Sequence, residues 1–241
     1  MPQDNEVLLH QAQISTNYVR ILLAKLSQKN SVDIDSFLAG RNLDKALLVR
    51  QDGMLPMSTF LLLMEEAAAT THDPCLGLHY YEDIDFKDLG IFGYALLNSE
   101  SLGDALALSC RYYCLFQSDM KITLSTSGDR AQVAYQITAR NLPYSRQDSE
   151  MTIMAIAMVV RRLIDDNWRP EAVYFQHPAP ADTSEHKRLL CSNLHFDHPV
   201  NKIVFDKALL QAPVSNADTK LSQSLEATLE QLLTLRQLPS E

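Results

Sequence analysis

One segment of this sequence is predicted to be a helix that the rest of the protein surrounds. Ser145 and Asp148 have the spacing of a helix N-cap and an acidic first turn, and the helix is expected to continue to about Asn167. Residues 151–160 are apolar on nearly every side of this helix. The run is too short to cross a bilayer, so other parts of the chain must bury it. The sequence therefore predicts a long central helix in the protein core.

Strand patterns lie on both sides of this helix. Residues 121–126 and 131–138 alternate in polarity around a turn at 127–129, which predicts a hairpin. The short apolar run at 91–97 predicts a buried strand ahead of it, followed by a helix that Ser101 and Asp104 begin with a capping box. After the central helix we expect a strand at 172–177, a helix from Asp182, and strands at 194–197 and 202–206.

The first third of the chain has helical spacing instead. Residues 14–29, 33–38 and 57–70 carry apolar side chains at positions that share one helix face. The predicted fold class is therefore α+β, with a helical N-terminal layer followed by two β-α-β-β units and a long buried central helix.

Charge and composition restrict the partners of this chain. Its 241 residues include 30 acids and 21 Lys and Arg, which gives a formal net charge of −9 without a concentrated basic patch, so we expect it not to bind DNA by itself. The first ten residues lack the apolar core of a secretory signal, and no segment is long enough to span a membrane. We therefore expect a cytoplasmic protein without a membrane partner, whose four cysteines are free thiols.

Several short motifs in a fixed order resemble the N-terminal, arabinose-binding-like effector domain of AraC-type bacterial transcription regulators. The motifs are DPCLGL at 73–78, LGIFGYALLNS at 89–99, LGDAL at 102–106, RRL at 161–163, WRP at 168–170, VYFQHPAP at 173–180 and VFDKALL at 204–210. No single motif is specific, but their order and spacing together are.

This resemblance implies a domain that senses a small organic effector and associates with itself. We expect an effector-binding domain at 1–218, helical to about 89 and mixed at about 90–211, and a C-terminal helix or linker at 219–241. In the family two helix-turn-helix units follow and bind DNA, so DNA is an expected partner only through that module, which we expect to be absent from this chain.

Large aromatic side chains are concentrated between residues 80 and 116, where eight of them lie. Ligand pockets are mostly apolar with a few convergent polar groups, so this region is the predicted effector site. The alternative is that these rings belong to the core, with their hydroxyls paired inside it. The candidate ligand-binding residues are Phe92, Tyr94, Tyr112, Tyr113 and Phe116, with Arg146 and Glu150 as polar contacts.

Two other functions remain open, of which the first involves Cys110 and Cys114. These residues are one helical turn apart, and a thiolate pair can bind a soft metal or respond to oxidation. No four-ligand set is evident, so we expect no metal site. Motifs for phosphate-binding loops, serine hydrolases and zinc peptidases are absent, so we expect neither an enzyme nor a cofactor. A pure dimerisation module is the other alternative.

A leucine stripe near the C-terminus predicts self-association. After a helix start at Asp218, Leu221, Leu225, Leu229 and Leu232 recur at steps of four, four and three residues. An apolar helix face must be buried, either on its own domain or on a second copy of the chain. Because the resemblance implies self-association, we expect a homodimer to which this helix contributes.

Overall fold

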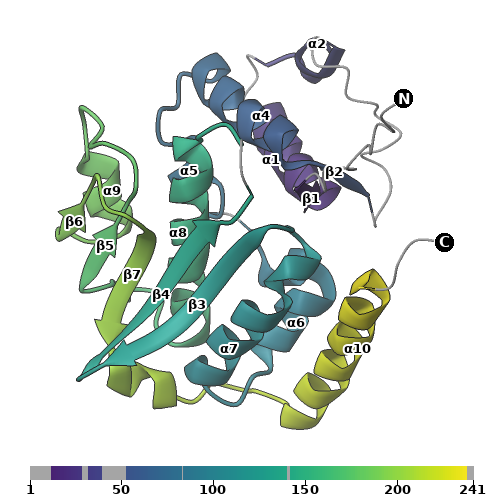
Figure 1. The fold of residues 1–241 in the computed structure, drawn as a ribbon, viewed down its shortest axis with the longest axis vertical. Coiled ribbons are helices and arrows are strands. Elements are labelled where there is room, and N and C mark those ends of the chain that lie inside the picture. Colours follow the sequence, from purple (N-terminus) through teal and green to yellow (C-terminus); the bar gives the residue numbers. More distant parts are fainter. Residues whose placement is uncertain (1–11, 29–31, 40–52, 83, 140–141, 238–241) are drawn as a thin grey trace, which may run out of the picture.

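The predicted central helix is α8, which spans Arg146–Leu163 and runs behind the main sheet (Figure 1). The computed structural model describes residues 12–28, 32–39, 53–82, 84–139 and 142–237. The Ser145 hydroxyl accepts a hydrogen bond from the backbone N–H of Asp148, so the predicted N-cap is confirmed. Thirteen of the eighteen residues of α8 are buried, which places the helix inside the protein as its composition requires.

A five-stranded sheet with the order β3-β4-β7-β5-β6 covers one side of α8. All neighbours are antiparallel except β5 and β6. The predicted hairpin is confirmed, because Ser127 pairs with Arg130 across a two-residue turn whose Gly128 has a φ of 58°. The strands are β3 (Met120–Ser127), β4 (Arg130–Ile137), β5 (Ala172–Tyr174), β6 (Leu194–His195) and β7 (Asn201–Asp206).

The N-terminal layer is helical as predicted, and it also contains a small two-stranded sheet. The strands β1 (Gln13–Ser15) and β2 (Met54–Pro56) pair antiparallel, and the Ser15 N–H donates to the Phe116 carbonyl, which ties this layer to the rest of the domain. The helices of the layer are α1 (Thr16–Gln28), α2 (Ile34–Ala39), α4 (Met57–Thr70) and α5 (Leu76–His79).

The strand predicted at residues 91–97 is wrong, because this segment is the helix α6 (Gly90–Leu97). A short apolar run has no periodicity that separates a buried strand from a buried helix. Gly93 allows α6 to lie directly on the preceding 3-10 helix η1 (Phe86–Leu89), since a Cβ atom at this position would overlap the Phe86 carbonyl oxygen. The first of the two predicted units therefore begins with a helix instead of a strand.

The other predicted elements are present, and the α+β class is confirmed. The capping box of Ser101 and Asp104 begins α7 (Leu102–Tyr112), which leads through η2 (Tyr113–Leu115) into β3. In the second half, β5 precedes α9 (Ser184–Leu189), and β6 and β7 follow. After η3 (Lys207–Gln211), the chain reaches its last helix.

The last described helix, α10 (Thr219–Gln237), lies beside α6, α7 and η2 at the edge of the molecule (Figure 1). Its start is as predicted, because the Asp218 carboxylate accepts the backbone N–H groups of Lys220 and Leu221. None of the helices in the described parts of the chain is long and apolar enough to cross a membrane.

Candidate functional site

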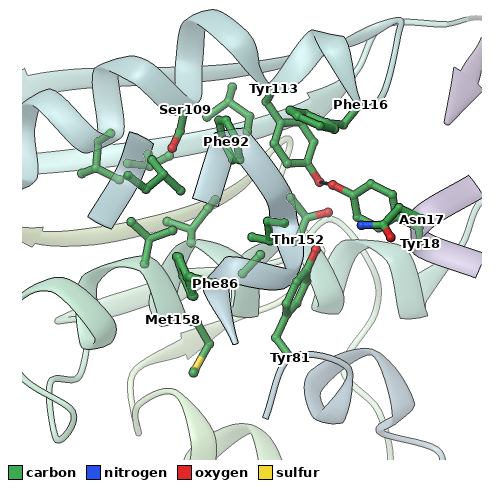
Figure 2. A pocket seen from close by; sticks show the side chains of 18 of the residues that line it. Asn17, Tyr18, Tyr81, Phe86, Phe92, Ser109, Tyr113, Phe116, Thr152 and Met158 are labelled. Atoms are coloured by element: carbon green, nitrogen blue, oxygen red, sulfur yellow. Dashed lines mark hydrogen bonds between the residues drawn. The ribbon is translucent and has the colours of Figure 1, made fainter. Parts of the chain in front are cut away.

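A largely apolar cavity lies where the N-terminal layer meets α6, α8 and the sheet (Figure 2). Its open volume is about 60 Å³. Besides aliphatic and alanine side chains, three small polar residues reach it, namely Asn17, Ser109 and Thr152. We call it the aromatic cavity after the six rings in its wall, which are Tyr18, Tyr81, Phe86, Phe92, Tyr113 and Phe116.

Four hydroxyl groups converge at one end of this cavity. The Tyr18 hydroxyl donates to the Tyr113 hydroxyl over 2.6 Å, and the Tyr81 and Thr152 side chains point toward the same place (Figure 2). The Thr152 side chain is 1% exposed, and its oxygen has no hydrogen-bond partner among the described residues. We refer to Tyr18, Tyr81, Tyr113 and Thr152 as the hydroxyl cluster.

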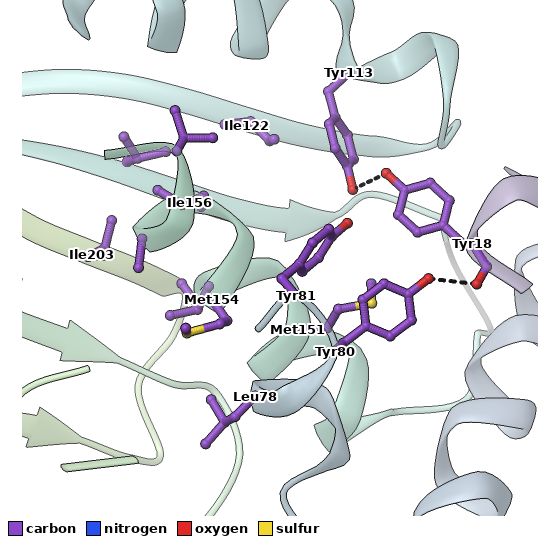
Figure 3. Packing of buried hydrophobic residues seen from close by; sticks show 14 of the residues in the cluster. Tyr18, Leu78, Tyr80, Tyr81, Tyr113, Ile122, Met151, Met154, Ile156 and Ile203 are labelled. Atoms are coloured by element: carbon purple, nitrogen blue, oxygen red, sulfur yellow. Dashed lines mark hydrogen bonds between the residues drawn. The ribbon is translucent and has the colours of Figure 1, made fainter. Parts of the chain in front are cut away.

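A hydrogen bond to the backbone of α1 helps to hold Tyr18, and with it the hydroxyl cluster, in place. Tyr80 donates a hydrogen bond of 2.6 Å to the carbonyl oxygen of Tyr18, and its ring stacks edge-on against Tyr81 at a centroid distance of 4.9 Å (Figure 3). Met151 of α8 packs beneath these rings in the same view. The hydroxyl cluster is therefore built by residues from four separate parts of the chain.

The electrostatics of the cavity favour neutral hydroxyls. Burial raises the pKa of Tyr18, Tyr81 and Tyr113 well above the ordinary tyrosine range, so all three keep their protons at neutral pH. No Asp, Glu, Lys, Arg or His is among the described residues that line the cavity. Its wall can therefore exchange hydrogen bonds with a ligand but has no ionic group to pair with one.

Three of the predicted ligand contacts line the aromatic cavity, namely Phe92, Tyr113 and Phe116. The rings of Phe92 and Phe116 lie 5.2 Å apart between centroids, and Phe92 and Tyr113 lie 6.2 Å apart in an edge-on arrangement. Tyr94 is on the outer side of α6 with 42% of its surface exposed. The Tyr112 hydroxyl points to α10, where Glu230 accepts its hydrogen bond at 2.9 Å.

Arg146 and Glu150 lie outside this cavity in a second buried polar group, which we call the Glu150 cluster. The fully buried Glu150 carboxylate lies 2.9 Å from Arg146 Nε, 2.7 Å from His186 Nε2 and 3.5 Å from His177 Nε2. Burial lowers the pKa of His177. His186 belongs to α9 and His177 follows β5, so the Glu150 cluster connects these two elements to α8.

Sequence reasoning missed the residues that complete the cavity from the N-terminal side and from α8. Tyr18 gave no signal, because nothing local shows that it approaches Tyr113. Tyr81 belongs to the aromatic concentration at residues 80–116 but was not singled out as a ligand contact. Thr152 did carry a signal, since it is the one polar residue in the apolar run 151–160. A lone hydroxyl inside a buried helix needs a partner, and none is present among the described residues.

The two cysteines of the metal or redox alternative are poorly placed for that chemistry. Burial raises the pKa of both Cys110 and Cys114, which disfavours the thiolate that binds metals and reacts with oxidants. The Cys114 sulfur donates a weak hydrogen bond to the Arg111 carbonyl. Within the described parts of the chain, no three or more His, Cys, Asp or Glu side chains are grouped so that they could hold a metal ion.

The helix α10 lies against the outside of the cavity wall. Leu229 is fully buried between α10 and its own domain, and Leu225 and Leu233 pack partly against it. Charged groups surround this contact, with Glu230 paired to Arg111 at 2.8 Å and Arg236 donating to the carbonyl oxygens of Cys114 and Leu115. The outward side of α10 carries Leu221, Leu232 and Leu235, which are 42%, 43% and 65% exposed.

Comparison with known families identifies a match over most of the chain. A family model for the N-terminal arabinose-binding domain of AraC transcription regulators matches residues 32–214. The chain is 24% identical over 188 residues to the ornithine utilization regulator of Pseudomonas aeruginosa. It is 23% identical over 186 residues to the HTH-type transcriptional regulator VirS of Mycobacterium tuberculosis. These matches cover 76% and 75% of this chain and 54% of each relative, so it spans about half their length.

A solved structure supports the fold. The transcriptional regulator CdpR from Pseudomonas aeruginosa matches with a TM-score of 0.62 at 18% sequence identity, covering 90% of this chain and 65% of that one. At this identity the likeness concerns the fold alone. The matched family and the two sequence relatives are transcription regulators and not enzymes, which confirms the expectation of a non-enzymatic protein.

Proposed function

Because this chain belongs to the family of N-terminal arabinose-binding domains of AraC transcription regulators, we propose that it senses a small organic effector in the aromatic cavity. The observation that carries the proposal is the hydroxyl cluster at the end of an apolar cavity, where the buried Thr152 hydroxyl has no partner in the described protein. Ligand sites combine apolar walls with a few such polar groups, whereas an ordinary core pairs them internally.

We further propose that α10 carries the response to the effector. Phe92 belongs to α6, and Phe116 directly follows η2, and both of these elements contact α10. A ligand that moves either ring would therefore act on elements that α10 contacts. In a regulator that also carries a helix-turn-helix unit, residues 219–237 would connect the sensor to that unit and alter DNA binding.

The test begins with an effector screen of amino acids, amines, sugars and fatty acids by thermal shift. An effector at a hundred times its Kd should stabilise the fold by about 2.7 kcal/mol. Its affinity is then measured for Ala155→Leu, which fills the cavity, and for Tyr94→Phe, which changes a ring on the outer side of α6. We expect Ala155→Leu to abolish binding and Tyr94→Phe to leave it unchanged. Wild-type affinity in a folded Ala155→Leu protein would refute the site.

We also propose that the chain forms a homodimer through the outward side of α10. The apolar positions on this side follow one another at alternating steps of four and three residues, which is the spacing of a two-helix seam. They are Leu221, Leu225, Leu232 and Leu235, with Thr228 at the remaining position of the series, and Leu225 lies at the edge of this side because it also packs partly against its own domain. Leu229, which the sequence placed in the dimer contact, is already buried within its own domain, so the outward leucines are the better candidates.

Light scattering during size exclusion tests the dimer. The double variant Leu232→Asp, Leu235→Asp should be a folded monomer, because both side chains are exposed in the single chain and the substitutions leave the docked face intact. Gln223→Asp with Thr234→Asp is the control for added charge at exposed positions of the same helix. A monomeric wild type would refute the dimer, and a dimeric double variant would refute the role of this face.

A further inference from the structure

The wall of the aromatic cavity selects against a charged ligand. Among the described residues that line it, none is acidic or basic, and its tyrosines keep their protons. An ion that enters such a site loses its hydration without gaining an ionic partner, which is strongly unfavourable. The buried Asp148 carboxylate accepts a hydrogen bond of 2.5 Å from the Tyr135 hydroxyl and does not line the cavity.

The cavity nevertheless requires one polar group. The hydroxyl cluster lies at one end, and Met158 and Ser109 lie away from it (Figure 2). The Ser109 hydroxyl already donates to the Ala105 carbonyl oxygen at 3.0 Å. The Thr152 hydroxyl has neither a donor nor an acceptor among the described residues although it is buried. A ligand with a single polar substituent satisfies this group and leaves its apolar part against the apolar wall.

The size of the cavity limits the ligand further. About 60 Å³ is open, whereas an engineered apolar cavity that binds benzene measures roughly 150 Å³. The difference must come from side chains that move on binding. Phe92 and Phe116 face this space from the wall, with tilted rings 5.2 Å apart between centroids. A single ring demands the least expansion and can pack edge-on against these two residues.

We propose that the aromatic cavity takes a compact, uncharged, single-ring organic molecule whose one neutral polar substituent hydrogen-bonds with the hydroxyl cluster. This inference rests on the proposed function of the cavity and adds the chemical class of the ligand. It separates the effector of this chain from sugars, which carry many hydroxyls, and from amino acids, which are zwitterions.

Four probes with the same ring test the class: benzyl alcohol, toluene, benzoate and benzylamine, the last of which is cationic at neutral pH. Dissociation constants are measured by NMR titration of the full chain. We expect benzyl alcohol to bind at least about tenfold more tightly than either ion. Thr152→Val, which has nearly the same shape, should weaken benzyl alcohol about three- to tenfold and change toluene by less than about twofold. Tyr94→Phe is the matched control and should change neither.

The outcomes separate the ligand class from the site. Benzoate or benzylamine binding as tightly as benzyl alcohol, with loss of binding in Ala155→Leu, overturns the class and leaves the cavity as the effector site. Binding that neither Ala155→Leu nor Thr152→Val affects overturns both. Failure of benzyl alcohol to bind at its highest soluble concentration overturns the class, and the effector screen then tests the cavity independently.

Discussion

Removing the Leu229 side chain should release α10 from the domain without unfolding the rest. Leu229 is fully buried, and replacing a buried leucine by alanine costs about 2–5 kcal/mol. The flanking ion pair of Arg111 and Glu230 is 58% and 45% exposed, and exposed pairs contribute about 0–1 kcal/mol. The leucine therefore dominates the contact, and Leu229→Ala should weaken the docking of α10 by at least about 2 kcal/mol.

Hydrogen exchange measured by mass spectrometry reports this change directly. Amides of α10 exchange when the helix opens locally, and a loss of about 2 kcal/mol should accelerate their exchange about thirtyfold. Peptides from α8 should keep their protection, because the core around this helix does not include α10 in its main contacts. Thr234→Ala is the control, since this side chain is exposed on the same helix.

Two results would refute the reasoning. Equal exchange of α10 in Leu229→Ala and Thr234→Ala would show that the buried leucine does not hold the helix. Faster exchange of α8 to the same extent as α10 would show that the variant unfolds the whole domain, so that α10 is not a separately opening element.

Three further predictions concern stability. Burial raises the pKa of Asp148 to about 6, so the folded state binds this proton more tightly than the unfolded chain. Relative to Asp148→Asn, the wild type should gain about 2.4 kcal/mol of unfolding free energy between pH 7.5 and about pH 4, and parallel urea titration curves would contradict this. Gly93→Ala should lower stability by at least about 2 kcal/mol, because its Cβ would collide with the Phe86 carbonyl, and an unchanged melting temperature would disprove that contact. Glu150→Ala should cost about 3–5 kcal/mol, because it leaves buried partners unpaired. Glu171→Ala breaks only the exposed pair with Arg130 and should leave the denaturation midpoint nearly unchanged; equal midpoint shifts in the two variants would contradict the burial of the Glu150 cluster.

The elements with local signals were predictable from the sequence. The cap at Ser145, the capping box at Ser101 and the turn at Gly128 each fix their own backbone through hydrogen bonds or φ, and all three are confirmed. The helix at 90–97 was not predictable, because its aromatic and aliphatic residues suit a buried strand equally well. What decides it is the close approach of Gly93 to η1, which is a tertiary contact.

The sequence predicted only those residues of the candidate site that lie close together along the chain. The concentration of rings between residues 80 and 116 led to Phe92, Tyr113 and Phe116, which share the cavity. Their partner Tyr18 lies 95 residues before Tyr113, and no periodicity relates the two. Arg146 and Glu150, which were expected as polar contacts of this site, lie in the separate Glu150 cluster, because polar residues on a buried helix do not reveal which of several neighbouring clusters they join.

Because α10 packs against α6 and η2, its position and the affinity of the cavity for an effector can be thermodynamically coupled. When two binding events act on one structural element, each changes the other's equilibrium constant by the same factor. If a ligand in the aromatic cavity changes the position of α10, then a second chain or DNA that changes the position of α10 must change the ligand's affinity. The factor is the same as the one by which the ligand changes the affinity for that partner. Couplings of this kind amount to about 5- to 150-fold. Effector affinities measured with and without operator DNA would therefore differ, and their ratio would give the strength of the signal that α10 transmits.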